Sequence, residues 1–126
     1  MNRIMLLEDD PTMLSLLETL LEIEGYVVFH TIDFDEAVAR VSEVDPDLLI
    51  MDVNLRNANG LEVLKDMRAD NGLMGTLVIM SSGMDLHTEC IEKGADDFIL
   101  KPYMPDELVK KIEELLEARE GRLNTK

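Results

Sequence analysis

Asp47-Leu48-Leu49-Ile50-Met51-Asp52 is an unbroken apolar run with a carboxylate at each end. Its apolar residues do not alternate with polar ones, so a strand formed here must be covered on both faces, as in the interior of a parallel sheet with helices on each side. Asp52 then lies at the carboxyl end of that strand. Ligands of open α/β sheets bind in the crevice at this edge. The stretch therefore predicts an α/β protein with Asp52 in its binding site.

Short apolar runs and amphipathic segments alternate along the rest of the chain. The expected strands are Ile4–Leu7, Tyr26–Phe29, Leu48–Met51, Leu77–Met80 and Asp97–Leu100. The expected helices start at Pro11, Asp35, Leu61, Leu86 and Pro105 and end before Gly25, at Val44, before Asn71, at Lys93 and at Arg119. Such an alternation implies right-handed βαβ crossovers and a doubly wound parallel sheet between two helical layers.

Local signals predict the ends and buried faces of two helices. Asp10 is the expected N-cap of the first helix, and Gly121 is the expected stop of the last. Helical spacing predicts the buried stripe of the first helix as Met13, Leu16, Leu17 and Leu20. It predicts the buried stripe of the last helix as Leu108, Ile112, Leu115 and Leu116.

Length and charge restrict the class of protein. A chain of 126 residues fits one domain. Its formal net charge of -15, from 12 basic and 27 acidic residues, disfavours direct binding to nucleic acid or to an anionic membrane. Cys90 is the only cysteine, so no internal disulfide forms. The chain shows no signal peptide and no apolar run near the ~18 residues needed to span a bilayer. We therefore expect a cytoplasmic protein.

Polar side chains follow the ends of four expected strands. Because parallel strands end at the same edge of a sheet, these residues should gather there: Glu8, Asp9, Asp52, Ser82 and Lys101. Three crowded carboxylates repel one another and need a cation, a raised pKa or both, and an oxygen-rich acidic site suits Mg²⁺. An aspartate can attack phosphorus and form an acyl phosphate when the charge on the phosphoryl oxygens is neutralised. Mg²⁺, Lys101 and Ser82 would each take one of these oxygens.

Four segments resemble those of bacterial two-component response regulator receiver domains of the chemotaxis-regulator type, in order and spacing from Ile4 to about Leu116. They are Leu7-Glu8-Asp9-Asp10-Pro11, Leu49-Ile50-Met51-Asp52, Met80-Ser81-Ser82-Gly83 and Phe98-Ile99-Leu100-Lys101-Pro102. The resemblance implies a flavodoxin-like (βα)5 three-layer sandwich with strand order 2-1-3-4-5. It also implies a phosphoacceptor switch rather than an enzyme, with at most self-catalysed phosphorylation and dephosphorylation.

The same resemblance implies the roles of single residues. Asp52 would accept the phosphoryl group from a sensor histidine kinase or a histidine phosphotransfer protein, and Lys101 would bind the phosphate. The implied Mg²⁺ ligands are Asp9, Asp52 and the backbone carbonyl of Asn54, with Glu8 acting through a water. Ser82 and Phe98 would be the switch pair, and Phe98 is expected to turn inward on phosphorylation. Departures from the commonest family pattern are Glu8 for aspartate, Arg56 for proline, Ser82 for threonine, Phe98 for tyrosine and Met104 for a Ser or Asp cap.

The resemblance also suggests how a signal would leave the domain. Phosphorylation would switch the face formed by the fourth helix, the fifth strand and the fifth helix, which would bind a downstream protein or output domain or form a phosphorylation-dependent homodimer. We expect residues 1–120 to be the receiver domain and 121–126 a C-terminal tail, with no output domain. Whether the chain is a stand-alone receiver or a piece of a longer regulator stays open, as do the kinase, the pathway, the output type, the oligomeric state and the phosphoryl lifetime.

Three alternatives belong to other classes. A flavodoxin-like flavin site needs a phosphate-cradling loop after the first strand, and Glu8-Asp9-Asp10 has the wrong charge for it. A phosphatase with an aspartate nucleophile would have a second acid two residues later, where Asn54 stands. A pseudo-receiver scaffold would not need the acids, the hydroxyl and the lysine that this chain retains.

Overall fold

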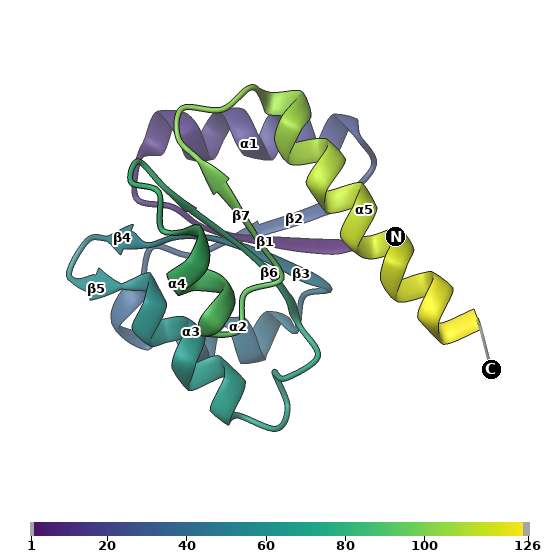
Figure 1. The fold of residues 1–126 in the computed structure, drawn as a ribbon. Coiled ribbons are helices and arrows are strands. Elements are labelled where there is room, and N and C mark those ends of the chain that lie inside the picture. The colour runs from purple at the N-terminus through teal and green to yellow at the C-terminus, as the bar shows by residue number, and fades with distance from the viewer. Residues whose placement is uncertain (1, 125–126) are drawn as a thin grey trace.

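A parallel sheet of five strands forms the middle layer of the computed structural model, which describes residues 2–124 (Figure 1). Its strands are β1 (Arg3–Leu7), β2 (Val27–His30), β3 (Leu48–Asp52), β6 (Leu77–Ser82) and β7 (Asp97–Leu100). They lie in the order β2-β1-β3-β6-β7, and every neighbouring pair is parallel. The numbering skips a small hairpin of β4 (Asn54–Leu55) and β5 (Ala58–Asn59), so this is the predicted order 2-1-3-4-5.

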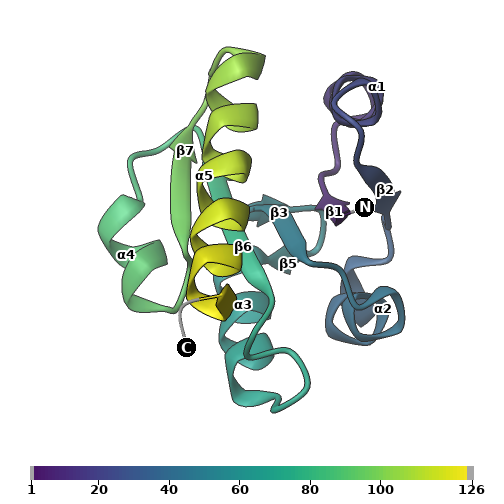
Figure 2. The same cartoon turned by 90° about the vertical axis from the view of Figure 1, so that its right-hand side faces the viewer.

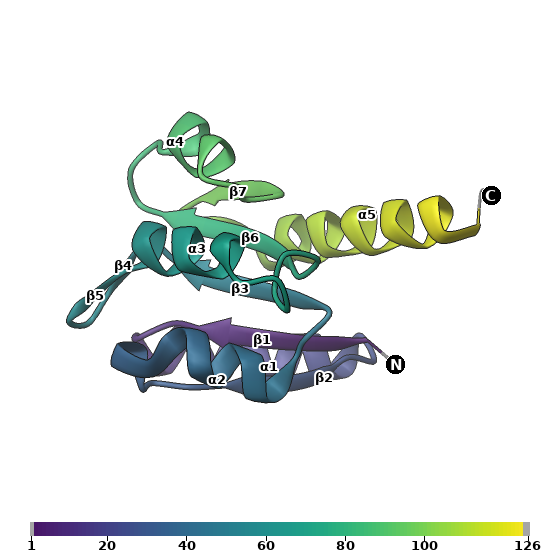
Figure 3. The same cartoon turned by 90° about the horizontal axis from the view of Figure 1, so that it is seen from below.

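Helices cover both faces of the sheet, as Figures 1 and 2 show. The helices are α1 (Pro11–Ile23), α2 (Ala37–Val44), α3 (Gly60–Ala69), α4 (His87–Glu92) and α5 (Pro105–Asn124). α1 and α5 pack on one face against Ile4, Leu6, Leu48 and Ile50. The helices α2, α3 and α4 lie on the other face (Figure 3), where their buried side chains pack against Met5, Leu7, Leu49 and Met51. Successive residues of each strand thus pack into the hydrophobic cores on opposite faces of the sheet. This confirms the prediction that the strand at Leu48–Met51 is covered on both faces.

The buried face of α1 differs from the predicted stripe. Leu14, Leu17 and Leu21 are buried, whereas Leu16 is 52% exposed. Leucine occupies several sides of this helix, so periodicity alone does not select the face that meets the sheet. The prediction for α5 was closer, because Leu108, Ile112 and Leu116 are buried and Leu115 is partly buried.

Other differences concern the ends of elements. The predicted stop at Gly121 is wrong, because α5 continues through it to Asn124 and extends past the sheet in Figures 1 and 3. Among the described glycines only Gly25 and Gly94 have positive φ, the conformation by which glycine commonly ends a helix. The helix predicted from Asp35 begins as a 3-10 turn, Phe34–Glu36, before α2. The predicted loop 53–60 contains the β4–β5 hairpin.

Within residues 2–124 no helix is both long and apolar enough to cross a bilayer.

Candidate functional site

A lysine lies between two carboxylates at the carboxyl edge of the sheet. The Lys101 Nζ donates hydrogen bonds of 2.9 Å to Glu8 Oε1 and 2.9 Å to Asp52 Oδ2. Glu8 and Asp52 are buried, with 5% and 8% of their surfaces exposed. Because both carboxylates face the same ammonium group, the strand ends meet as the sequence predicted.

A third carboxylate completes the cluster. Glu8, Asp9 and Asp52 can each offer one oxygen such that these oxygens lie within 4.8 Å of one another. Among the described residues, Asp9 has no hydrogen-bond donor or ion-pair partner for its carboxylate. Oxygen donors this close fit a hard divalent cation such as Mg²⁺, which prefers carboxylate and water ligands.

The loop after β1 holds the acids in place. Asp10 Oδ1 accepts hydrogen bonds of 3.0 Å from Thr12 N and 3.4 Å from Met13 N, which confirms Asp10 as the N-cap of α1. The Asp10 N–H in turn donates to Glu8 Oε2 at 3.1 Å. Both oxygens of Glu8 therefore have a donor, one from this loop and one from Lys101.

Burial and ion pairing act on the Lys101 ammonium in opposite directions. Burial by itself would lower the pKa of Lys101, but the hydrogen bonds to Glu8 and Asp52 outweigh it and raise the pKa above 10.5. The Tyr103 phenol also interacts electrostatically with Lys101, Glu8 and Asp52. Burial raises the pKa of this phenol to about 12, with Lys101 opposing and Glu8 and Asp52 adding to the rise. Both groups are therefore protonated at neutral pH.

The backbone of Asp52 is packed tightly against the start of α3. A Cβ on Gly60 would lie 2.3 Å from the Asp52 carbonyl oxygen, and the Gly60 N–H donates to Val53 O at 2.7 Å. Asn59 caps α3 through Oδ1, 2.9 Å from Leu61 N. Sequence reasoning identified the cap but missed the close approach of Gly60, because a glycine after an asparagine is typical of any turn.

The other predicted site residues lie around this cluster. Asn54 opens the β4–β5 hairpin with its side chain exposed. Ser82 is buried at the end of β6, and its Oγ accepts a hydrogen bond of 3.1 Å from Met84 N. Phe98 pairs with Met80 across the sheet and is 5% exposed, with its ring perpendicular to that of His87. The ring thus already lies inward in this structure.

Tyr103 is the residue near the site that sequence reasoning missed. It follows Lys101 by two residues, so its position after the last strand was the available signal. Arg56 of the hairpin, Glu8 and Asp9 also line a cavity of about 280 Å³ together with Leu14, Ile32 and Phe34.

A doubly wound parallel sheet with the strand order 2-1-3-4-5 defines the flavodoxin-like α/β class. Within that class, the chain belongs to the response regulator receiver domain family, whose sequence model, described as "Response regulator receiver domain", matches residues 4–113. Domains of this family are signalling switches, and this membership leaves the flavin and phosphatase alternatives without support.

Curated relatives and solved structures agree with this membership. The chain is 33% identical over 120 residues to the DNA-binding response regulator MtrA of Mycolicibacterium smegmatis, covering 94% of this chain and 52% of that protein. It is 35% identical to the transcriptional regulatory protein TrcR of Mycobacterium tuberculosis, covering 90% and 45%. It thus spans about half the length of these relatives. A CheY-like response regulator receiver domain protein from Methanospirillum hungatei is 30% identical, with a TM-score of 0.84 and coverage of 97% and 98%.

Proposed function

We propose that this receiver domain accepts a phosphoryl group on Asp52, in the presence of Mg²⁺, from a sensor histidine kinase or histidine phosphotransfer protein in the cytoplasm. The observation that carries the proposal is the contact of Lys101 Nζ with Asp52 Oδ2, 2.9 Å long, beside two further carboxylates. A buried carboxylate that already faces a cation is suited to receive a phosphoryl group, because the Lys101 ammonium offsets part of the negative charge that this group brings.

The reaction needs little beyond positioning. An Asp52 carboxylate oxygen attacks phosphorus, the bond from phosphorus to the donor's nitrogen or oxygen breaks, and the electron pair leaves with the donor. Lys101 can follow the transferred group with its ammonium, because its raised pKa keeps it charged. The Ser82 hydroxyl supplies a further hydrogen-bond donor from the end of β6.

The residues present fit a magnesium ion. Asp9, Asp52 and the backbone carbonyl of Asn54 would hold it, with Glu8 acting through a water. When bound, Mg²⁺ would neutralise negative charge on the phosphoryl oxygens. Asp9 is suited to this role because its carboxylate has no other partner within the described part of the chain.

The signal would leave through the face of α4, β7 and α5. Ser82 is bonded to the segment that leads into this face, since its Oγ accepts the Met84 N–H three residues before α4. A phosphoryl group on Asp52 would draw the Ser82 hydroxyl away by a charge-assisted hydrogen bond and release Met84. Phe98 lines a groove of about 520 Å³ on the same face, with Leu100, Glu107 and Lys111. We expect a downstream protein, an output domain or a second copy of the chain to bind there.

Intact-mass measurement with acetyl phosphate and Mg²⁺ tests the proposal. The wild type should gain one phosphoryl group, whereas Asp52→Asn, or the wild type in excess chelator, should gain none. Asp66→Asn, an exposed aspartate on α3, is the matched control and should react like the wild type. Equal modification of Asp52→Asn would refute Asp52 as the acceptor.

A further inference from the structure

Helix α4 is short and unequally held at its two ends. It spans only His87–Glu92, and its N-cap residue Leu86 has no side-chain capping hydrogen bond. A helix of this length is not stable by itself. Its position must therefore come from contacts with the rest of the domain.

Few hydrogen bonds hold the segment that leads into α4, although Leu86 packs against the core and the His87 ring contacts Phe98. The Met84 N–H is bonded to Ser82 Oγ at 3.1 Å, but the Met84 side chain is 64% exposed. The His87 N–H reaches Asp85 Oδ1 only at 3.4 Å. The main chain of the entry into α4 is therefore bonded to the hydroxyl that phosphorylation is proposed to move.

The exit of α4 is fixed much more firmly. Gly94 has φ +109°, its N–H donates to Ile91 O at 3.0 Å, and the Ala95 N–H donates to Cys90 O at 3.0 Å. The Gly94 carbonyl accepts a hydrogen bond of 2.9 Å from Arg68 Nε of α3. The packing is close, because a Cβ on Gly94 would lie 2.8 Å from Arg68 Cγ.

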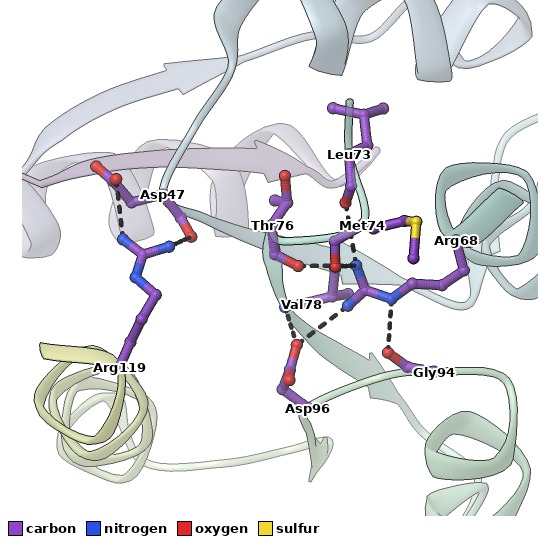
Figure 4. A network of polar contacts seen from close by, with 9 residues as sticks. All are labelled: Asp47, Arg68, Leu73, Met74, Thr76, Val78, Gly94, Asp96 and Arg119. Atoms are coloured by element: carbon purple, nitrogen blue, oxygen red, sulfur yellow. Dashed lines mark hydrogen bonds and ion pairs between the residues drawn. The ribbon is translucent and has the colours of Figure 1, made fainter. Parts of the chain in front are cut away.

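Arg68 connects this exit to the amino edge of the sheet, as Figure 4 shows. Its Nη1 donates to the carbonyl oxygens of Thr76, Leu73 and Met74, at 2.9, 3.2 and 3.3 Å. Its Nη2 lies 3.1 Å from Asp96 Oδ2, and this oxygen also accepts the Val78 N–H at 2.9 Å. All three guanidinium nitrogens are thus engaged, and the Arg68 side chain is 20% exposed.

We propose that Arg68 is a positioning residue that fixes the C-terminal end of α4. With this end fixed, a displacement at Ser82 turns α4 about Gly94. Hinges absorb motion in a few residues at the ends of elements, and here Arg68 decides which end moves. The inference rests on the proposed function only for the cause of the displacement. The unequal anchoring itself can be tested without phosphate.

Amide hydrogen exchange tests the anchoring. Arg68→Lys removes the planar fork but keeps the charge, so exchange of the Lys93–Asp96 amides should accelerate about tenfold while Met84 and Cys90 are unchanged. Arg119→Lys is the matched control, because Arg119 also bonds a carbonyl and a carboxylate at this edge, those of Asp47 (Figure 4). It should leave Lys93–Asp96 unaffected. An equal acceleration throughout the domain, or none at Lys93–Asp96, would overturn the proposal.

Beryllofluoride, a mimic of the phosphoryl group, tests the pivot in the wild type. The amides of Met84 and His87 should shift, while the Arg68 Nε–H resonance and the Lys93–Asp96 amides stay in place. In Arg68→Lys the shifts should spread to Lys93–Asp96, with phosphorylation of Asp52 unchanged. Equal shifts at both ends of wild-type α4 would overturn the pivot. No shift anywhere would count against the phosphoacceptor role of Asp52, whereas the exchange experiment would still decide whether Arg68 anchors α4.

Discussion

Lys101 and Asp52 form an ion pair of 2.9 Å between the ends of β7 and β3, and the same ammonium reaches Glu8. Without this cation, buried carboxylates would face one another unpaired. The contact therefore serves the stability of the metal-free domain as well as the proposed chemistry.

Lys101→Met tests this double role. In excess chelator it should lower the free energy of unfolding by about 2 kcal/mol, less than for a fully buried pair because Lys101 keeps some contact with solvent. Saturating Mg²⁺ should reduce the loss. Urea titrations measure both the loss and the effect of Mg²⁺, with Lys65→Met on α3 as the control.

The same variant has a pH dependence. Because the pKa of Lys101 is raised above 10.5, the difference in unfolding free energy from wild type should persist below pH 10.5 and vanish as the pH rises through the folded-state pKa. An equal loss in Lys65→Met would contradict this account.

Asp9→Ala separates metal binding from stability. Asp9 has no partner among the described side chains, so its removal only relieves repulsion from Glu8 and Asp52. Stability in chelator should stay the same or rise, whereas calorimetric titration should show Mg²⁺ affinity falling at least about tenfold. Asp66→Ala should change neither quantity. Unchanged affinity in Asp9→Ala would place the metal elsewhere.

The sequence predicted what burial and topology determine. The run Leu48–Met51 fits only a strand covered on both faces, and the strand ends brought Asp52 and Lys101 together without any knowledge of loops. Helical periodicity failed in α1, where Leu14, Leu16 and Leu17 offer more than one apolar stripe and only the sheet selects among them.

Contacts with the main chain escaped prediction. Arg68 bonds four carbonyl oxygens, and a carbonyl belongs to every residue, so no side-chain pattern indicates these partners. The need for glycine at position 60 escaped prediction for the same reason, because the atom that a side chain there would meet is the main-chain carbonyl oxygen of Asp52. Gly121 shows the converse: a glycine by itself does not stop a helix when the chain keeps a helical φ.

Cys90 should be unreactive in the folded domain. It is fully buried, and burial, with a smaller contribution from Glu89, raises the pKa of its thiol to about 11. A thiol reagent at pH 8 should label the native protein slowly and the urea-unfolded protein at once.

The raised pKa of Cys90 also makes stability depend on pH. The contribution of the buried thiol to stability is fully present below pH 9.0 and is lost as the pH rises toward 11. The stability difference from Cys90→Ala should therefore be constant below pH 9 and shrink above it. Rapid labelling of the native protein would contradict this burial.

Gly60→Ala and Gly121→Ala should have opposite effects. At Gly60 a Cβ meets the Asp52 carbonyl at 2.3 Å and Val53 Cα at 2.9 Å, and this main chain cannot move without moving the proposed phosphoacceptor. Gly60→Ala should cost about 1–3 kcal/mol of unfolding free energy and slow phosphorylation of Asp52 by acetyl phosphate. At Gly121, apart from the nearby backbone of its own helix, no atom of the described residues lies within 4 Å of the added Cβ, and the residue is helical. Gly121→Ala should therefore gain about 0.5 kcal/mol and leave phosphorylation unchanged. Urea unfolding and intact-mass time courses measure the two effects, and a Gly60→Ala variant as stable and as reactive as the wild type would show that the end of β3 is not held by this contact.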